Sequence, residues 1–212
     1  MPLVYQQNIN QHSRLGLWHI TEPESFFLQE VPLQRSITHP HKRLQHLAGR
    51  RLLRELFPDF PYNLIRIADT RKPFLENEAY HFSISHCGDY AAVLVSRTER
   101  VGVDVEAETW RTEKVKHRFL LPNEIQLIET VAAEKNIVPV QLFTLAWSIK
   151  EALYKWYGSG EIDFKEHLRI HTLQVQDNGG TAACQVLKQH AVALQVHFLF
   201  IGGNCISWVK SS

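Results

Sequence analysis

The sequence predicts an α+β protein, and three observations support this class. Runs with the alternation of β-strands occupy the middle of the chain, and further β-like residues form its tail. A block with helical periodicity, from about residue 112 to 157, separates them. Hydrophobic residues make up 44% and charged residues 21% of the 212 positions, which is enough for a sizeable core. The length suits one domain or two small ones.

The first hundred residues combine one long helix with several short strands. Residues 14–21 predict a strand, and residues 23–30 predict a short helix after it. Residues 39–60 have helical periodicity, with their leucines on one face, a basic opposite face and prolines near the end. Four alternating runs separated by turn-like residues then predict strands at 63–68, 80–85, 90–96 and 101–106.

The second half begins helical and ends in strands. Residues 112–136 predict two helical pieces around Pro122, and we expect Asn123 to be the N-cap of the second piece. A further helix is predicted from 139 to about 157, followed by glycines that end it. Residues 191–210 predict a hairpin around two glycines and an asparagine.

Charge and cysteine content exclude several classes of function. The net charge of +1 gives no general attraction to nucleic acid or membranes. Three dispersed cysteines form neither a disulfide framework nor a paired metal-ligand spacing. No apolar run approaches the ~20 residues of a membrane span, and the N-terminus lacks the pattern of a signal peptide. We therefore expect a soluble, cytoplasmic protein with reduced thiols and with no nucleic-acid or membrane partner.

Two acidic residues share one face of the strand VGVDVE, residues 101–106. Asp104 and Glu106 are spaced i and i+2, which places them roughly 7 Å apart on the same side. Gly102 lies on that side too and leaves room for something bulky to approach. For this strand alone, a solvated polar face on an edge strand is the commoner interpretation.

A third acid lies on the helix WSIKEALYK, residues 147–155. Trp147, Glu151 and Lys155 are spaced four residues apart and share one helix face. Alone, the Glu–Lys pair would be an ordinary surface pair. Three acids from two elements, flanked by Lys150 and Lys155, instead indicate a site of mixed charge. Because Mg²⁺ takes one or two carboxylates and completes its octahedron with water and phosphate oxygens, this set suggests Mg²⁺ bridged to a phosphorylated substrate.

Further candidates for binding an anion lie upstream. Arg71 and Lys72 precede Pro73, which stiffens their loop. Ser85 and His86 end a predicted strand. A lone histidine after a strand is commonly a packing or turn residue, but beside a basic helix and a basic loop it could clamp a phosphate.

Taken in order, five motifs resemble those of the 4′-phosphopantetheinyl transferases: KPF, FSISHCGDYAAV, VGVDVE, RFLLPNE and WSIKEALYKWYGSG. The nearest likeness is to the long, single-chain type that activates carrier proteins of polyketide and nonribosomal peptide synthesis, such as surfactin synthetase. The resemblance covers roughly residues 35–165. It implies a monomer that is a pseudo-dimer of two similar α+β halves, here 1–100 and 101–212. Coenzyme A would bind in the cleft between them.

The resemblance also implies roles for the acidic site. Asp104, Glu106 and Glu151 would coordinate Mg²⁺ together with the pyrophosphate of coenzyme A. Lys155 would neutralise the phosphate in transfer, and Glu151 is also a candidate base for the carrier serine, directly or through water. The serine hydroxyl would attack the β-phosphate and expel adenosine 3′,5′-bisphosphate.

Coenzyme A contacts are implied at matching motif positions, with His86 on the 3′-phosphate. These positions are Lys72, Pro73, Ser85, His86 and Lys150. Three upstream residues are candidates between which the sequence does not choose: Arg35, Arg43 and His46. Arg71 stands where family members often have glycine, so we expect this loop to sit differently.

The predicted protein partner is an apo acyl or peptidyl carrier protein, which presents an acidic helix beside its serine. A basic cluster just after the first acidic motif could dock that helix or could be a solvated face: Arg111, Lys114, Lys116, His117 and Arg118. The alternative to an enzyme is a non-catalytic module that binds coenzyme A or a carrier protein. A histidine-rich metal-binding protein is a third interpretation, prompted by 12 histidines that are scattered apart from the pair in HPH, residues 39–41.

Overall fold

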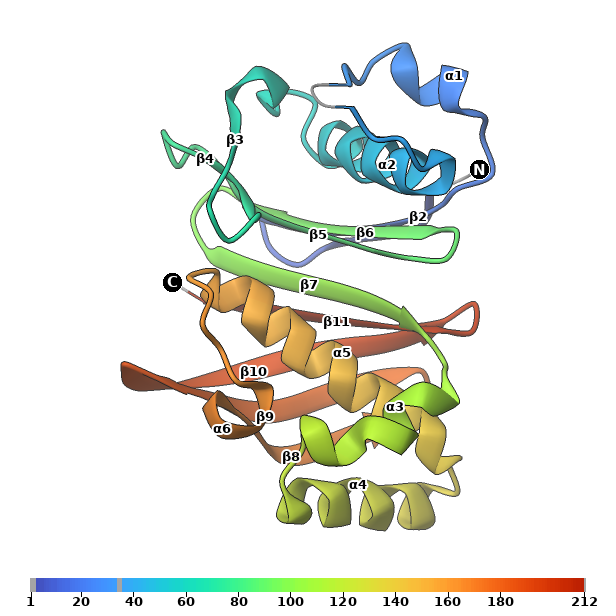
Figure 1. Ribbon diagram of the computed structural model, residues 1–212, viewed down its shortest axis with the longest axis vertical. Helices are drawn as coiled ribbons and strands as arrows, with labels where there is room; N and C mark the ends of the chain where they lie inside the picture. The colour runs from blue at the N-terminus through green and yellow to red at the C-terminus, as the bar shows by residue number, and fades with distance from the viewer. Residues whose placement is uncertain (1–2, 34–35, 212) are drawn as a thin grey trace. The chain divides into compact units, whose positions relative to one another are not determined.

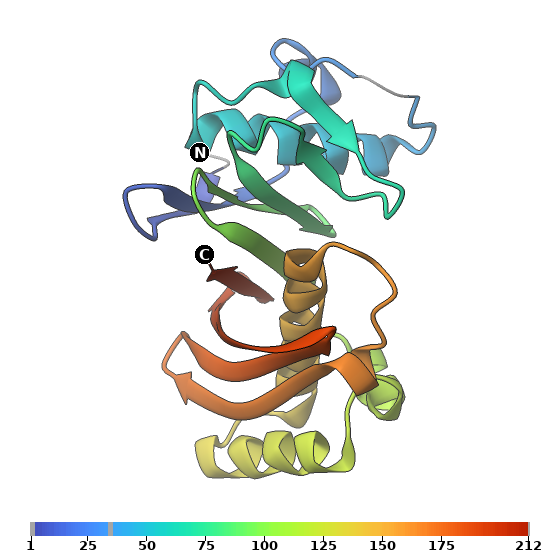
Figure 2. The ribbon, with the colours of Figure 1, turned by 90° about the vertical axis from the view of Figure 1, so that its left-hand side faces the viewer.

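A computed structural model describes residues 3–33 and 36–211, and it confirms the α+β class (Figures 1 and 2). The chain divides into two compact units. The first unit comprises the described residues up to Val101, and the second unit is Gly102–Ser211. Each unit packs a long helix against its own β-sheet.

In the first unit, four strands form an antiparallel sheet in the order β1-β2-β6-β5. A small hairpin, β3-β4, adds a second, two-stranded sheet. The strands are β1 (Leu3–Asn8), β2 (Ser13–His19), β3 (Ile65–Ile67), β4 (Pro73–Leu75), β5 (His81–Cys87) and β6 (Tyr90–Ser96). The helices are α1 (Glu24–Leu28), α2 (Pro40–Leu56) and the 3₁₀ turn η1 (Tyr62–Leu64).

Helix α2 packs on β2 and β6, as its predicted leucine face requires. The side chains of Leu47, Leu52 and Leu56 are fully buried there. Gly16 on β2 lets them approach, because a Cβ at this position would lie 2.9 Å from Leu52 Cδ1. The helix begins at Pro40, whose fixed φ suits the first helical position. It ends at Leu56, just before the prolines at 58 and 61 that predict its end.

In the second unit, five strands form a sheet in the order β7-β11-β10-β9-β8. The strands are β7 (Arg100–Ala107, whose first two residues belong to the first unit), β8 (Leu168–Gln176), β9 (Gly179–Lys188), β10 (His190–Ile201) and β11 (Asn204–Ser211). The helices are α3 (Trp110–Val115), the 3₁₀ turn η2 (Lys116–Arg118), α4 (Pro122–Lys135), α5 (Pro139–Tyr157) and α6 (Phe164–His167).

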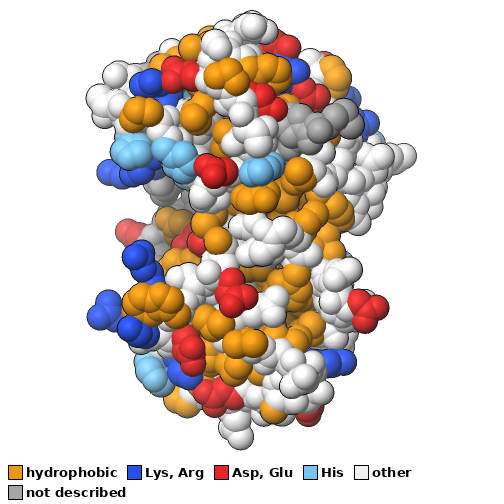
Figure 3. Space-filling view, turned by 90° about the vertical axis from the view of Figure 1, so that its right-hand side faces the viewer, with side chains coloured by type: hydrophobic (Ala, Val, Ile, Leu, Met, Phe, Trp, Pro, Cys, Tyr) orange, Lys and Arg blue, Asp and Glu red, His pale blue; other side chains and the backbone are white. Residues whose placement is uncertain are grey.

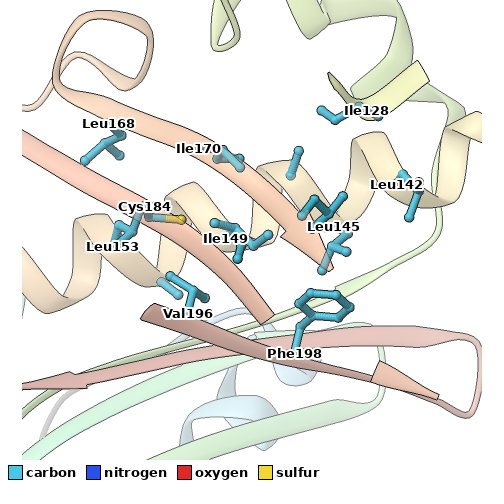
Figure 4. Close-up of a cluster of buried hydrophobic side chains, with 14 of the residues drawn as sticks. Ile128, Leu142, Leu145, Ile149, Leu153, Leu168, Ile170, Cys184, Val196 and Phe198 are labelled. Carbon is cyan, nitrogen blue, oxygen red and sulfur yellow. The ribbon is translucent and has the colours of Figure 1, made fainter. Parts of the chain in front are cut away.

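Helix α5 is the central element of the second unit. Its apolar face, which includes Leu142, Leu145, Ile149 and Leu153, points toward buried side chains of the sheet such as Val196 (Figure 4). The helix runs over the predicted residues, from a proline at its first position to a glycine cap, Gly158, with a left-handed φ of 73°. The expected β10–β11 hairpin is also confirmed.

Two features differ from expectation. The N-cap of α4 is Leu121 and not Asn123, because Pro122 takes the first helical position and the Glu124 carboxylate accepts the Leu121 N–H at 2.7 Å. Strands β1, β4, β8 and β9 were not predicted. Among the described residues, none of the helices combines the length and apolar character that crossing a membrane requires.

Candidate active site

The acidic site of the second unit is formed where β7 crosses α5, and Gly102 makes that crossing possible. A Cβ at Gly102 would lie 2.1 Å from the carbonyl oxygen of Ala152 and 2.7 Å from the backbone nitrogen of Trp156. Only a residue without a side chain allows the helix backbone to lie this close to a strand. The bulky neighbour that Gly102 admits is therefore the helix itself.

Asp104 lies two residues beyond Gly102 and on the same side of β7, so it too faces α5. Its side chain is almost fully buried, with the residue only 2% exposed. The ammonium group of Lys155 donates to Asp104 Oδ1 at 2.6 Å. This short, charge-assisted bond joins the strand to the last turn of the helix.

Glu106 meets the same helix one turn before Glu151. The indole nitrogen Nε1 of Trp147 donates to Glu106 Oε1 at 3.1 Å. Trp147, Glu151 and Lys155 form the helix face that the sequence predicts, and the structure brings this face against the two acids of β7. The convergence of strand and helix that we expected is thus present.

Glu151 is half-buried between these groups, and its proton affinity reflects them. Burial is the main cause that raises the pKa of Glu151 to about 7. The charge of Lys155 opposes this rise, and the charges of Asp104 and Glu106 contribute to it. The three carboxylates are therefore close enough to repel one another. At neutral pH this concentration of negative charge favours uptake of either a proton or a cation.

The donor set fits a hard divalent cation in its chemistry. Three carboxylates supply the oxygen ligands that Mg²⁺ prefers, and binding a cation would relieve their mutual repulsion. In the arrangement described here Lys155 holds one oxygen of Asp104. No three metal-ligating side chains in the described part of the chain are already disposed around a common point. Their assignment as Mg²⁺ ligands stays a prediction.

Lys150 does not lie at this site, which corrects the prediction that it contacts coenzyme A. Its side chain is 0% exposed and its ammonium group forms an ion pair with Glu124 Oε2 at 2.9 Å. The same nitrogen donates to the carbonyl oxygens of Phe119, Phe164 and Leu168 at 2.7–3.0 Å. An ammonium enclosed by these acceptors stabilises the core of the second unit and presents no donor to a ligand.

Three threonines fix the point where the chain leaves β7. Thr144 on α5 accepts the backbone N–H of Thr109 at 3.2 Å and lies 3.0 Å from the hydroxyl of Thr112. Thr109 in turn caps α3. Local spacing does not indicate these residues, because a hydroxyl contact between segments 35 residues apart leaves no pattern in the sequence.

Of the upstream basic candidates, two have partners within the first unit. Arg43 binds the Glu24 carboxylate through Nε and Nη2, each at 2.8 Å. His46 is buried, and its Nδ1 lies 3.0 Å from Nη1 of Arg50. Arg35 lies outside the described residues. The choice between the three as coenzyme A contacts therefore stays open.

The KPF loop combines a part-buried amine with a left-handed backbone. Burial, together with the nearby charge of Arg100, lowers the pKa of Lys72 to about 8. Arg71 has a φ of 66°, the region that glycine enters most easily. Arginine at this position thus keeps a backbone conformation typical of glycine, at some steric cost. Pro73 begins β4.

Ser85 and His86 lie near the end of β5 and have side chains in different environments. Ser85 is buried, at 6% exposure, whereas His86 is exposed. Neighbouring residues of a strand point to opposite faces. Only His86 of this pair is therefore open to a ligand from solvent.

Comparison with known proteins supports the motif assignment. The sequence model of the 4′-phosphopantetheinyl transferase superfamily matches residues 100–203, which contain all three acids and Lys155. Over this segment, just under half of the chain, the sequence is similar to the 4′-phosphopantetheinyl transferase superfamily.

Three relatives are similar over part of their length. The 4′-phosphopantetheinyl transferase HetI of Nostoc is 28% identical over 60% of this chain and 57% of its own. Enterobactin synthase component D of Salmonella typhi is 33% identical over 55% of this chain and 49% of its own. The L-aminoadipate-semialdehyde dehydrogenase-phosphopantetheinyl transferase of Xenopus laevis is 28% identical over 54% of this chain and 43% of its own. The matches thus span about half the length of these relatives.

Proposed function

We propose that this protein transfers the 4′-phosphopantetheine group from coenzyme A to a serine of an apo carrier protein, in a reaction that requires Mg²⁺ and releases adenosine 3′,5′-bisphosphate. The observation that carries the proposal is the meeting of Asp104, Glu106 and Glu151 with Lys155 at one crossing of strand and helix. The similarity of residues 100–203 to the transferase superfamily supports it. We also propose a cytoplasmic monomer of the long, single-chain type.

Asp104, Glu106 and Glu151 would hold the cation. When bound, Mg²⁺ would offset the negative charge on the pyrophosphate oxygens as the P–O bond to the leaving group breaks. Lys155 now neutralises Asp104 at 2.6 Å. Since a cation at the acids would take over that task, the ammonium group would be released to neutralise the phosphate in transfer.

Glu151 is the candidate base. A carboxyl group with a pKa of about 7 is near the value at which a general base works best at neutral pH. It would take the proton of the carrier serine, directly or through a water molecule. Ligation of a cation would lower this pKa, so the base and ligand roles of Glu151 compete.

Coenzyme A would be held by residues of the first unit. His86 is exposed and would bind the 3′-phosphate. Lys72, with Arg100 near enough to depress its pKa, concentrates positive charge beside Pro73. Two like charges in a part-buried place favour an anion between them. Ser85 is buried, so it would support the residues that contact coenzyme A and would not face the solvent itself.

The carrier protein would dock on α3 and η2. Arg111, Lys114, His117 and Arg118 are exposed, whereas Lys116 binds Glu129 at 2.9 Å. Trp110 is 56% exposed, with the Lys114 ammonium 3.7 Å from its ring centroid. Figure 3 shows Lys and Arg side chains beside hydrophobic ones on this unit. A basic surface with an apolar centre suits an acidic amphipathic helix.

The test is a transfer assay with purified components. The protein is incubated with coenzyme A, Mg²⁺ and a panel of apo acyl and peptidyl carrier proteins, and the carriers are weighed by mass spectrometry. We expect at least one carrier to gain the mass of phosphopantetheine, and Asp104→Ala to abolish the gain without unfolding the protein. No gain on any carrier, with coenzyme A still bound, would favour the non-catalytic binding module instead.

A further inference from the structure

Trp147 connects the aromatic core of the second unit to one of the acids. Its indole N–H donates to Glu106 Oε1 at 3.1 Å. The indole ring meets Phe119 edge to face, with centroids 5.2 Å apart at 82°, and lies 5.3 Å from Phe164 at 30°. Because aromatic neighbours restrict the ring, the direction of its N–H is set by packing.

Those two neighbours are fixed in turn by a buried charge. The Lys150 ammonium donates to the backbone carbonyls of both Phe119 and Phe164, at 2.7 and 3.0 Å. Its ion pair with Glu124 is wholly enclosed, with both side chains 0% exposed. A continuous set of contacts therefore runs from a buried ion pair, through two phenylalanines, to the tryptophan and the acid.

Glu106 needs such support more than Asp104 does. Asp104 has a short, almost fully buried side chain that Lys155 holds directly. Glu106 has a longer side chain near the end of β7 and is only part-buried. A carboxylate offers about four acceptor positions, so a bond from the indole is compatible with ligation of a cation by the same group.

We propose that Trp147 is a positioning residue: its indole N–H holds the Glu106 carboxylate in the orientation that binds the divalent cation. Partners of metal ligands commonly fix ligand orientation in this way. The inference rests on the proposed function, since it assumes the cation site. It gives Trp147 a task beyond packing.

The test removes the N–H and keeps an aromatic ring. Trp147→Phe is compared with Trp156→Phe, a matched control on the same helix whose indole N–H donates to the Ser211 hydroxyl at 3.1 Å. Affinity for Mn²⁺, a paramagnetic substitute for Mg²⁺, is measured by electron paramagnetic resonance with coenzyme A present. Stability is measured by urea unfolding in chelator. We expect Trp147→Phe to weaken Mn²⁺ binding about 10-fold, Trp156→Phe to leave it unchanged, and the two variants to be similarly stable.

A double-mutant cycle tells positioning from general damage. If Trp147 acts through Glu106, adding Trp147→Phe to Glu106→Gln should cause no further loss of Mn²⁺ affinity. An equal loss in both backgrounds, or wild-type affinity in Trp147→Phe, would overturn the inference and leave the proposed cation site standing. If the wild-type protein binds no Mn²⁺, the cation site fails, and the inference fails with it.

Discussion

Gly102→Ala should damage the acidic site through a single methyl group. The new Cβ would lie 2.1 Å from the carbonyl oxygen of Ala152, against 3.4 Å for ordinary contact, a shortfall of about 1.3 Å. The obstacle is backbone, so rotation of a side chain cannot relieve it. The φ of Gly102 is not in the left-handed region, so the whole effect is steric. Strand β7 and helix α5 must move apart, and Asp104 must move away from Lys155.

Two magnitudes follow. Overpacking of this kind costs roughly 1–3 kcal/mol or more of unfolding free energy. A displacement of about 1 Å between catalytic groups can lower the rate of the chemical step about 100-fold. We expect both in Gly102→Ala, measured by urea unfolding and by transfer rate per folded molecule.

Gly16→Ala is the matched control. This residue lies in the other unit, and its new Cβ would meet only flexible side-chain ends, Leu52 Cδ1 at 2.9 Å and Leu56 Cδ2 at 3.1 Å. We expect a small loss of stability and an unchanged transfer rate. If Gly102→Ala proves as stable and as active as Gly16→Ala, the strand–helix crossing does not position the acids and the reasoning is refuted.

Three further predictions concern charged residues. Lys150→Met should lower the unfolding free energy by about 3–5 kcal/mol, because it leaves the buried Glu124 carboxylate without its cation. Lys135→Met, at an exposed position of the same unit, should change it by no more than about 0.5 kcal/mol. Equal effects of the two substitutions in urea titrations would contradict a stabilising role of the buried pair. Reversing charge at Arg111 and Lys114 should raise the KM for the carrier more than the KM for coenzyme A, and equal increases would argue against docking on α3. Lys72→Met should weaken coenzyme A binding yet stabilise the fold at pH 7 by up to about 3 kcal/mol, since folding lowers the pKa of this part-buried amine to about 8 and so penalises its charged form. That gain should shrink as pH rises from 8 toward 10.5, the ordinary pKa of lysine; a gain independent of pH would show that the charge is not its cause.

The local pattern of apolar and helix-ending residues was sufficient to predict the long elements of this fold. Helix α5 has a proline at its start, a glycine at its end and an unbroken apolar face, so its limits follow from the sequence. Strand β8 lacks a continuous strand pattern because an irregularity between Ile170 and Thr172 interrupts its alternation. Strand β9 is rich in Gly and Ala, which have low strand propensity. Asn123 is a good capping residue in isolation, yet the neighbouring Pro122 occupies the first helical position, so α4 begins before Asn123.

The contacts of the site depend on pairings between distant segments. Spacing alone predicts that Asp104 and Glu106 share a strand face and that Glu151 shares a helix face with Lys155. It does not predict that Trp147 bonds to Glu106, because 41 residues separate the two. The close approach at Gly102 was visible only as a missing side chain. From the sequence alone, the absence of a side chain at Gly102 suggests a bound ligand as readily as a packed helix.

The two lysines of the WSIKEALYK helix show how one helix serves both core and chemistry. Successive residues turn by about 100° around a helix, so Lys155 lies only about 40° from Glu151, whereas Lys150 lies about 100° away on the other side. One lysine therefore meets Asp104 and the other enters the core beside Glu124. Their charge alone predicted that both lysines lie at the acidic site, but their different directions around the helix axis separate them. That separation is useful to the proposed enzyme, because the buried lysine anchors the phenylalanines around Trp147 while the half-buried one lies at the acids and binds Asp104.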